Sequence, residues 1–209
     1  MRRRALTLAF VAATLVGGAC SDGRGSGATA PTVPESEANT PVVWVALGAD
    51  ETDETDGEGL EDEDRLRSSW TRLVFREALP RRTVHYNLAS ADATAAEALD
   101  RQVPAALEVE PTLVAVWLTS GDIDEATAPA DYERDLGAVV GALREDGARV
   151  LLANAPRSTT SRPYNEAVAR VAEDEGAELV DLSDVAFSRT VAGHRRAADA
   201  FAAALGEVP

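Results

Sequence analysis

Two apolar segments, Val42–Leu47 (VVWVAL) and Leu113–Leu118 (LVAVWL), decide the fold class of this 209-residue chain. Each is a nearly unbroken run of aliphatic, β-branched and aromatic residues, which is typical of a strand buried on both faces of a parallel sheet. A strand with one solvated face would instead alternate apolar and polar residues. The sequence therefore predicts two central strands of a parallel sheet that is covered by helices on both sides.

Weaker strand patterns and helical patterns alternate with these two runs. Three further strands are expected at residues 83–88, 149–153 and 178–182, and five helices at residues 68–79, 94–107, 131–145, 164–175 and 193–205. Thr94 and Glu97 fit a capping box at the start of the second helix. Because strands that alternate with helices form βαβ units, we expect an α/β fold. Its specific form would be a flavodoxin-like, three-layer α/β/α sandwich around a five-stranded parallel sheet.

The first 40 residues carry export signals. A basic start, MRRR, precedes a twelve-residue apolar run, and small residues then lead to Cys20, the only cysteine. We expect a signal peptide at 1–19, a lipid on Cys20 that anchors the protein at the extracytoplasmic face of the cell membrane, a flexible tether at 20–40 and one domain at 41–209. The alternative is cleavage near Ala19 without lipidation, which would give a secreted protein.

The charge balance excludes one class of partner. The chain has 36 acidic and 20 basic residues, for a formal charge of −16. Nucleic-acid binding needs basic patches that neutralise phosphates, so no nucleic-acid partner is expected. We expect a monomer that binds an unidentified ligand or protein of the cell envelope.

An acidic segment, Asp50–Asp64, holds ten carboxylates in fifteen residues. One interpretation is a solvated loop that keeps the protein soluble. The other is a calcium site, because Ca²⁺ takes six to eight oxygen ligands and carboxylates serve well. In that case Asp50, Asp92 and Asp122, which follow three different strands, would join the loop. We otherwise expect no cofactor.

The residues that follow the expected strands resemble a known family. Gly48-Ala49-Asp50 follows the first strand, Asn87-Leu88 end the second and lead to Asp92, Ser120-Gly121-Asp122 follow the third, and Gly193-His194 open the last helix. This order is similar to that of the SGNH/GDSL hydrolases, from about residue 41 to residue 205. The resemblance implies the fold of that family and hydrolysis of esters. It also implies a serine nucleophile, an oxyanion hole made by a glycine and an asparagine, and a histidine with an aspartate three residues before it.

When the motifs of the family are carried over position by position, other residues stand in this chain at the positions of the catalytic groups. The positions of the serine, the glycine, the asparagine and the histidine hold, in this order, Asp50, Asp92, Gly121 and Ser188. Val185 stands where the resemblance places the aspartate, and Asp184 is one residue away. Asp122, which follows the asparagine position, is the residue that matches.

No suitable base is expected near this centre. His85 lies inside the second strand, where we expect a packed or edge residue, and His194 opens the last helix, where we expect local hydrogen bonding. Ser90, Ser120 and Ser188 lie near the strand ends with no partner base in view. Asp50 and Asp92 are expected to face the same small volume, so their charges would repel each other and oppose an oxyanion.

The sequence therefore favours an inactive member of the family, a pseudoenzyme that serves as a binding or interaction module. Two alternatives remain. One is an active esterase or acylhydrolase with a relocated catalytic set, in which Asp50 or a serine at the strand ends attacks the ester. The other is a cation-binding module that uses the acidic segment.

Overall fold

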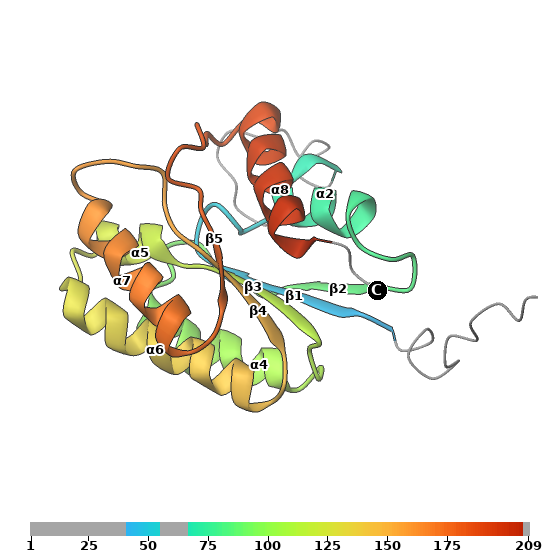
Figure 1. The fold of residues 1–209 in the computed structure, drawn as a ribbon, viewed down its shortest axis with the longest axis horizontal. Helices are drawn as coiled ribbons and strands as arrows, with labels where there is room; N and C mark the ends of the chain where they lie inside the picture. Colours follow the sequence, from blue (N-terminus) through green and yellow to red (C-terminus); the bar gives the residue numbers. More distant parts are fainter. Residues whose placement is uncertain (1–40, 55–66, 207–209) are drawn as a thin grey trace, which may run out of the picture.

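Five strands form one parallel sheet in the computed structural model, which describes residues 41–54 and 67–206 (Figure 1). The strands are β1 (Val43–Gly48), β2 (Val84–Asn87), β3 (Leu113–Trp117), β4 (Arg149–Ala153) and β5 (Glu178–Val180). Their order across the sheet is β2-β1-β3-β4-β5, and each neighbouring pair is parallel. The predicted α/β fold with a five-stranded parallel sheet is confirmed. Only β5 ends clearly early, two residues before its expected boundary.

Helices cover both faces of the sheet (Figure 1). One face is covered by α2 (Trp70–Glu77) and α8 (Val191–Leu205). The other face is covered by α3 (Ala95–Glu97), the π-helical turn η1 (Ala98–Gln102), α4 (Val103–Leu107), α6 (Pro129–Glu145) and α7 (Arg162–Asp174). A short helix that the sequence did not predict, α5 (Thr119–Asp124), follows β3 directly.

Several predictions from the sequence concern residues outside those that the structure describes. These are the signal peptide at 1–19, the lipidated Cys20, the tether at 20–40 and the stretch 55–66 of the acidic segment. Across 41–54 and 67–206, none of the helices combines the length and the apolar character that a membrane crossing needs.

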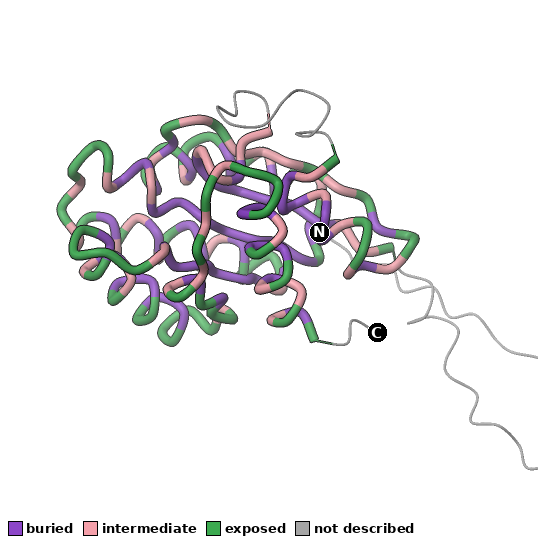
Figure 2. The backbone as a smooth tube through the Cα atoms, turned by 90° about the horizontal axis from the view of Figure 1, so that it is seen from above, coloured by how far each residue is buried: buried purple, intermediate pink, exposed green. Residues whose placement is uncertain are grey.

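Successive residues of the central strands enter two different cores, which explains their unbroken apolar pattern. Trp44 packs beneath α2 and α8, whereas Val45 packs toward α6 and α7. In the first core the rings of Trp70 and Phe201 are stacked, with centroids 4.1 Å apart and planes 12° apart. This contact joins α2 to α8. Figure 2 shows the resulting buried interior between exposed helix faces.

The segment predicted as one helix at 94–107 is divided into three. The capping box at Thr94 and Glu97 is present as expected. Beyond α3, however, the backbone widens into η1, where the N–H of Val103 donates to the carbonyl of Ala98, five residues earlier. Pro104 has no N–H to donate to residue 100, and this missing donor favours a π-turn just before it.

The end of β1 is held by a buried side chain on η1. The amide of Gln102 accepts from the N–H of Gly48 and donates to its carbonyl, both at 3.0 Å. A Cβ at Gly48 would lie 2.7 Å from the carbonyl oxygen of Trp117, so only glycine fits between the strand ends. These contacts fix the turn that carries Asp50.

We predict that Gln102→Leu lowers the free energy of unfolding by about 2 kcal/mol, because it leaves the buried N–H of Gly48 without a partner. Urea denaturation of the full-length protein measures the loss. Arg101→Leu, at the exposed neighbouring position, is the control and should change stability by about 0.5 kcal/mol or less. Equal effects of the two substitutions would contradict the role given to Gln102.

Candidate functional site

The turn after β1 places Asp50 where the carboxyl ends of three strands meet. Its Oδ1 accepts a hydrogen bond from the backbone N–H of Asp92 at 3.3 Å, and its Oδ2 lies 3.3 Å from Nη2 of Arg189. The side chain of Asp50 is only 12% exposed. The Asp50 carboxylate is therefore ion-paired, and it also accepts a hydrogen bond from a backbone N–H at the centre of the site.

The prediction that the carboxylates of Asp50 and Asp92 face the same volume and repel each other is wrong. Asp92 is an exposed residue, and its backbone N–H, not its carboxylate, meets Asp50. Arg189, on the loop before α8, supplies a positive charge that the sequence alone did not place there. Asp92 has φ +57°, a left-handed conformation that glycine adopts more readily than other residues.

The position that corresponds to the oxyanion asparagine has no room for a side chain. A Cβ built on Gly121 would lie 2.2 Å from the carbonyl oxygen of Ala93 and 2.8 Å from that of Asp92. The next residue, Asp122, is buried and accepts from the N–H of Ala95 at 2.7 Å, and burial raises the pKa of its carboxyl. The loop after β2 thus lies directly against the residues that follow β3.

The loop before α8 carries two neighbouring hydroxyls, those of Ser188 and Thr190. Ser188 is exposed, and its hydroxyl is 3.0 Å from that of Thr190, which caps α8 by accepting from the N–H of Gly193. Asp184 is 86% exposed and pairs with Arg157 at 3.1 Å, while Val185 packs partly buried against the core beneath α8. The carboxylate of Asp184 therefore pairs with Arg157 and not with Ser188.

The three carboxylates proposed as calcium ligands do not converge. Asp50 pairs with Arg189, Asp92 is exposed, and Asp122 is buried on the N–H of Ala95. In the part of the chain that the structure describes, no group of three or more His, Cys, Asp or Glu side chains could hold a metal ion. A calcium site built from these three residues is therefore not formed, because each carboxylate has a different local partner.

His194 bonds a distant helix rather than its own. Its Nδ1 accepts from the backbone N–H of Trp70 at 3.3 Å, which corrects the expectation of local hydrogen bonding. Burial lowers the pKa of His194 to about 4, so the ring is neutral at pH 7. With Nδ1 as acceptor, the neutral ring carries its proton on Nε2. Neither nitrogen is then placed to take a proton from a nucleophile.

His85 lies in the edge strand β2, where the sequence placed it. Its ring stacks on Phe75 of α2, with centroids 5.4 Å apart and planes 22° apart. Burial lowers the pKa of its imidazole. Among the described residues, no hydrogen bond joins His85 or His194 to Ser90, Ser120 or Ser188.

One serine at the strand ends does have a carboxylate partner, which the sequence analysis missed. The hydroxyl of Ser120 donates to Oε2 of Glu51 at 2.5 Å. Burial raises the pKa of Glu51 although the hydrogen bond from Ser120 opposes the shift. No local signal could have found this pair, because 69 residues separate its members.

Comparisons with known proteins show the family and the fold. A model of the GDSL-like Lipase/Acylhydrolase family matches residues 54–204. The chain belongs to this family. A search of curated proteins finds no match.

Solved structures of several hydrolases share the fold at low sequence identity. The crystal structure of TesA has a TM-score of 0.66 at 20% identity, covering 78% of this chain and 98% of TesA. An acetyl-xylooligosaccharide esterase from Geobacillus has a TM-score of 0.66 at 18% identity, covering 80% and 95% of the two chains. A putative GDSL-like lipase from Parabacteroides merdae reaches 0.67 at 12% identity, covering 79% and 95%. These likenesses establish the SGNH hydrolase fold.

A second group that the sequence analysis did not single out lies around Glu54, four residues after Asp50. Glu54 is 8% exposed and accepts from the hydroxyl of Ser69 at 2.7 Å, from Nε of Arg72 at 2.7 Å and from the hydroxyl of Thr71. Burial alone would raise the pKa of Glu54, but the bonds from Thr71, Ser69 and Arg72 outweigh it and keep that pKa below its usual value. Glu54 thus ties the start of the acidic segment to α2.

We predict that Glu54→Gln lowers the free energy of unfolding by about 2 kcal/mol at pH 7, since hydrogen bonds to a buried charge are lost. Because the folded-state pKa of Glu54 lies below its unfolded value, its stabilisation is complete above the unfolded pKa, about 4.3, and disappears as pH falls through the folded pKa. The difference between wild type and variant should therefore shrink below about pH 4. Urea titrations at pH 7, 5 and 3 measure it.

Glu77→Gln is the matched control, because Glu77 pairs with Arg195 at the surface. An exposed pair of this kind contributes about 0.5 kcal/mol or less. A stability difference for Glu54→Gln that stays constant from pH 7 to pH 3 would refute the assignment.

Proposed function

We propose that this member of the GDSL-like lipase/acylhydrolase family is catalytically inactive and acts as a binding or interaction module. The lipid on Cys20 would hold it at the extracytoplasmic face of the cell membrane, where it would bind a ligand or protein of the cell envelope. The observation that carries the proposal is the Asp50 carboxylate. It occupies the nucleophile position, pairs with Arg189 and accepts the N–H of Asp92.

The electrostatics of this arrangement oppose acyl transfer. The reaction needs hydrogen-bond donors aimed at a developing negative oxygen, and removal of one such donor typically costs about 10²–10³ in rate. Here the N–H of Asp92 already donates to the carboxylate of Asp50. The close contact between Gly121 and the carbonyl of Ala93 leaves no space for an asparagine side chain as a donor. An oxyanion would have to form beside the existing negative charge of Asp50.

Removal of a proton from the nucleophile by a general base is also unfavourable. A general base works best when its pKa lies near the working pH, and its acceptor atom must reach the nucleophile. His194 has a pKa of about 4, and its Nδ1 accepts from Trp70. The ion pair with Arg189 also makes Asp50 a poor nucleophile, because attack would break the pair and leave the guanidinium without its partner.

We predict no turnover of 4-nitrophenyl butyrate by the full-length protein above the rate in buffer. A fluorophosphonate probe, which labels activated serines, should leave the mass of the intact protein unchanged. An active esterase of the family serves as the positive control for both assays. A probe adduct on any hydroxyl, or ester turnover that disappears in Asp50→Ala, would refute the proposal.

An active enzyme with relocated groups is the second candidate, favoured by the 2.5 Å bond from Ser120 to Glu51. In that reaction the Ser120 hydroxyl would pass its proton to Glu51 while its oxygen attacks the acyl carbon of an ester. The C–O bond of the ester would then break, the alcohol would leave with the proton held by Glu51, and water would hydrolyse the acyl-serine. A raised pKa makes a carboxylate a stronger base, and burial raises that of Glu51. Loss of a fluorophosphonate adduct in Ser120→Ala, with Ser188→Ala as control, would support this candidate over the inactive module.

The location is tested separately from catalysis. In the producing cell we expect the wild type in the membrane fraction and Cys20→Ala in the soluble fraction, because the anchor is a lipid on that sulfur. Metabolic labelling with an alkyne fatty acid should mark only the wild type. Soluble, unlabelled wild type would refute the anchor and favour the secreted form.

A further inference from the structure

The edge of the sheet at β2 carries backbone groups that no other strand pairs. The N–H groups of Val84 and Leu88 donate to carbonyls of β1 at 2.8 Å and 2.9 Å. Because successive residues of a strand direct their backbone groups to opposite sides, those of His85 and Asn87 point away from β1. In the part of the chain that the structure describes, no backbone partner is found for these outward groups. Such an edge can pair with a further strand.

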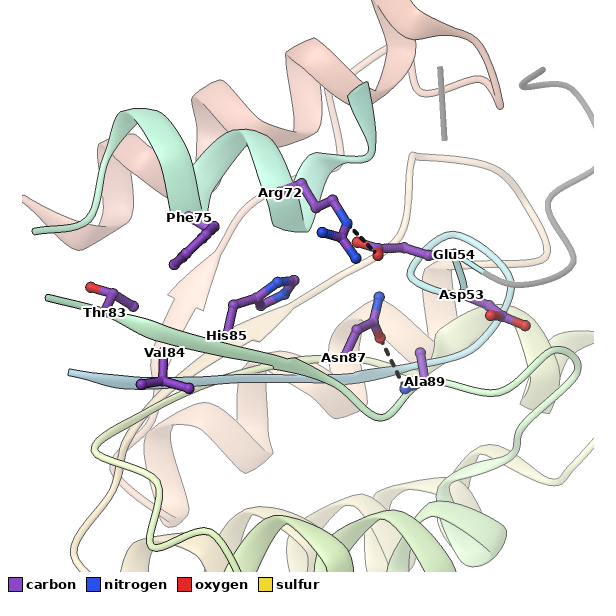
Figure 3. A pocket seen from close by; sticks show the side chains of 9 residues that line it. All are labelled: Asp53, Glu54, Arg72, Phe75, Thr83, Val84, His85, Asn87 and Ala89. Atoms are coloured by element: carbon purple, nitrogen blue, oxygen red, sulfur yellow. Dashed lines mark hydrogen bonds and ion pairs between the residues drawn. The ribbon is translucent and has the colours of Figure 1, made fainter. Parts of the chain in front are cut away.

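A groove of about 520 Å³ lies along this edge, between β2 and α2 (Figure 3). Thr83 and Asn87 are among the lining residues on the strand side, and Arg72 and Phe75 reach the groove from α2. The strand side of the lining extends over the whole length of β2, so an extended chain placed beside β2 would lie in this groove. Addition of a strand to an exposed sheet edge is a recurring mode of protein recognition.

The face of β2 that is turned away from α2 is apolar and exposed. Figure 3 shows His85 directed toward α2 and Val84 directed to the opposite side. Val84 is 44% exposed. Tyr86 lies two residues further along and therefore on the same face, and it is 38% exposed. An edge strand with exposed apolar side chains is a predicted site of association between chains.

The charges at the two ends of β2 have opposite signs. Arg81 and Arg82, both exposed, precede the strand, and Asp92, also exposed, follows it. Asp53 lies at the same end as Asp92, because its Oδ2 accepts from the N–H of Ala91 at 3.0 Å. A second β2 strand in antiparallel orientation would place the basic end of each copy beside the acidic end of the other. A parallel copy would instead bring like charges together, which destabilises strand pairing.

We propose that two copies of this chain associate through their β2 strands, which pair antiparallel and join the two sheets into one. The register follows from the outward backbone groups, because all of them are used when His85 of each copy pairs with Asn87 of the second copy. Tyr86 then faces Tyr86 of the second copy at the twofold axis, as a symmetric dimer requires. Val84 faces Leu88 of the second copy. This inference departs from the monomer expected from the sequence.

The size and the charge of the contact predict a weak dimer. The formal charge of −16 makes two copies repel each other, and salt at physiological concentration screens this repulsion beyond about 8 Å. A contact along one short edge strand buries little surface, so we expect dissociation at roughly 10–100 µM. The inference goes beyond the proposed function, since it depends neither on the lipid nor on the absence of catalysis.

Sedimentation equilibrium of the full-length Cys20→Ala protein at concentrations around this range tests the proposal, because this variant lacks the sulfur that would carry a lipid. We expect a monomer–dimer equilibrium. Tyr86→Lys would place two like charges opposite each other at the twofold axis and should raise the dissociation constant about tenfold or more. Leu179→Lys is the matched control, because Leu179 is 41% exposed on the other edge strand, β5, and it should associate as the parent protein does.

A disulfide test keeps the proposal falsifiable if Tyr86→Lys is unstable. In the Cys20→Ala background, Tyr86→Cys would place two thiols directly opposite each other. The Cα atoms of such a non-hydrogen-bonded pair are about 4.5 Å apart, a separation that a disulfide spans. Oxidised glutathione should therefore give a covalent dimer of Tyr86→Cys but not of Leu179→Cys.

Four results would overturn the inference. They are a monomer at every concentration, equal effects of Tyr86→Lys and Leu179→Lys, no cross-link in Tyr86→Cys, and a monomer whose β2 edge instead binds an unrelated extended peptide.

Discussion

The backbone at the carboxyl ends of β1, β2 and β3 is packed so closely that side chains are excluded at two positions, and the rest of the site depends on this. Gly48 lies against the carbonyl of Trp117 and is held by the amide of Gln102. Gly121 lies against the carbonyls of Asp92 and Ala93. With both positions closed, the carboxylate of Asp50 meets the N–H of Asp92 and the guanidinium of Arg189.

The ion pair between Asp50 and Arg189 explains how a carboxylate can occupy this half-enclosed place. An isolated charge with 12% exposure would lose much of its hydration, and the guanidinium together with the N–H of Asp92 compensates for that loss. The pair also links the turn after β1 to the loop before α8. The charge pair thus joins two loops that lie far apart in the sequence.

Fold and chemistry are separable in this protein because different residues determine them. The sheet and its two cores depend on buried apolar side chains, such as the stacked pair of Trp70 and Phe201, and these are independent of the groups at the strand ends. The SGNH hydrolase fold can therefore persist while the reaction centre changes.

The sequence by itself determined the parallel sheet, its five strands and the capping box at Thr94, and it placed Asp50 in the turn after β1. These features follow from local patterns, since the period of apolar residues defines an element and the face that it buries. The tertiary structure alone decided the pairing of Asp50 with Arg189, the bond from Ser120 to Glu51 and the burial of Glu54 beneath α2. Each of these contacts joins residues from different segments of the chain. It depends on the conformation that the loops adopt on the packed sheet, and no local sequence pattern predicts that conformation.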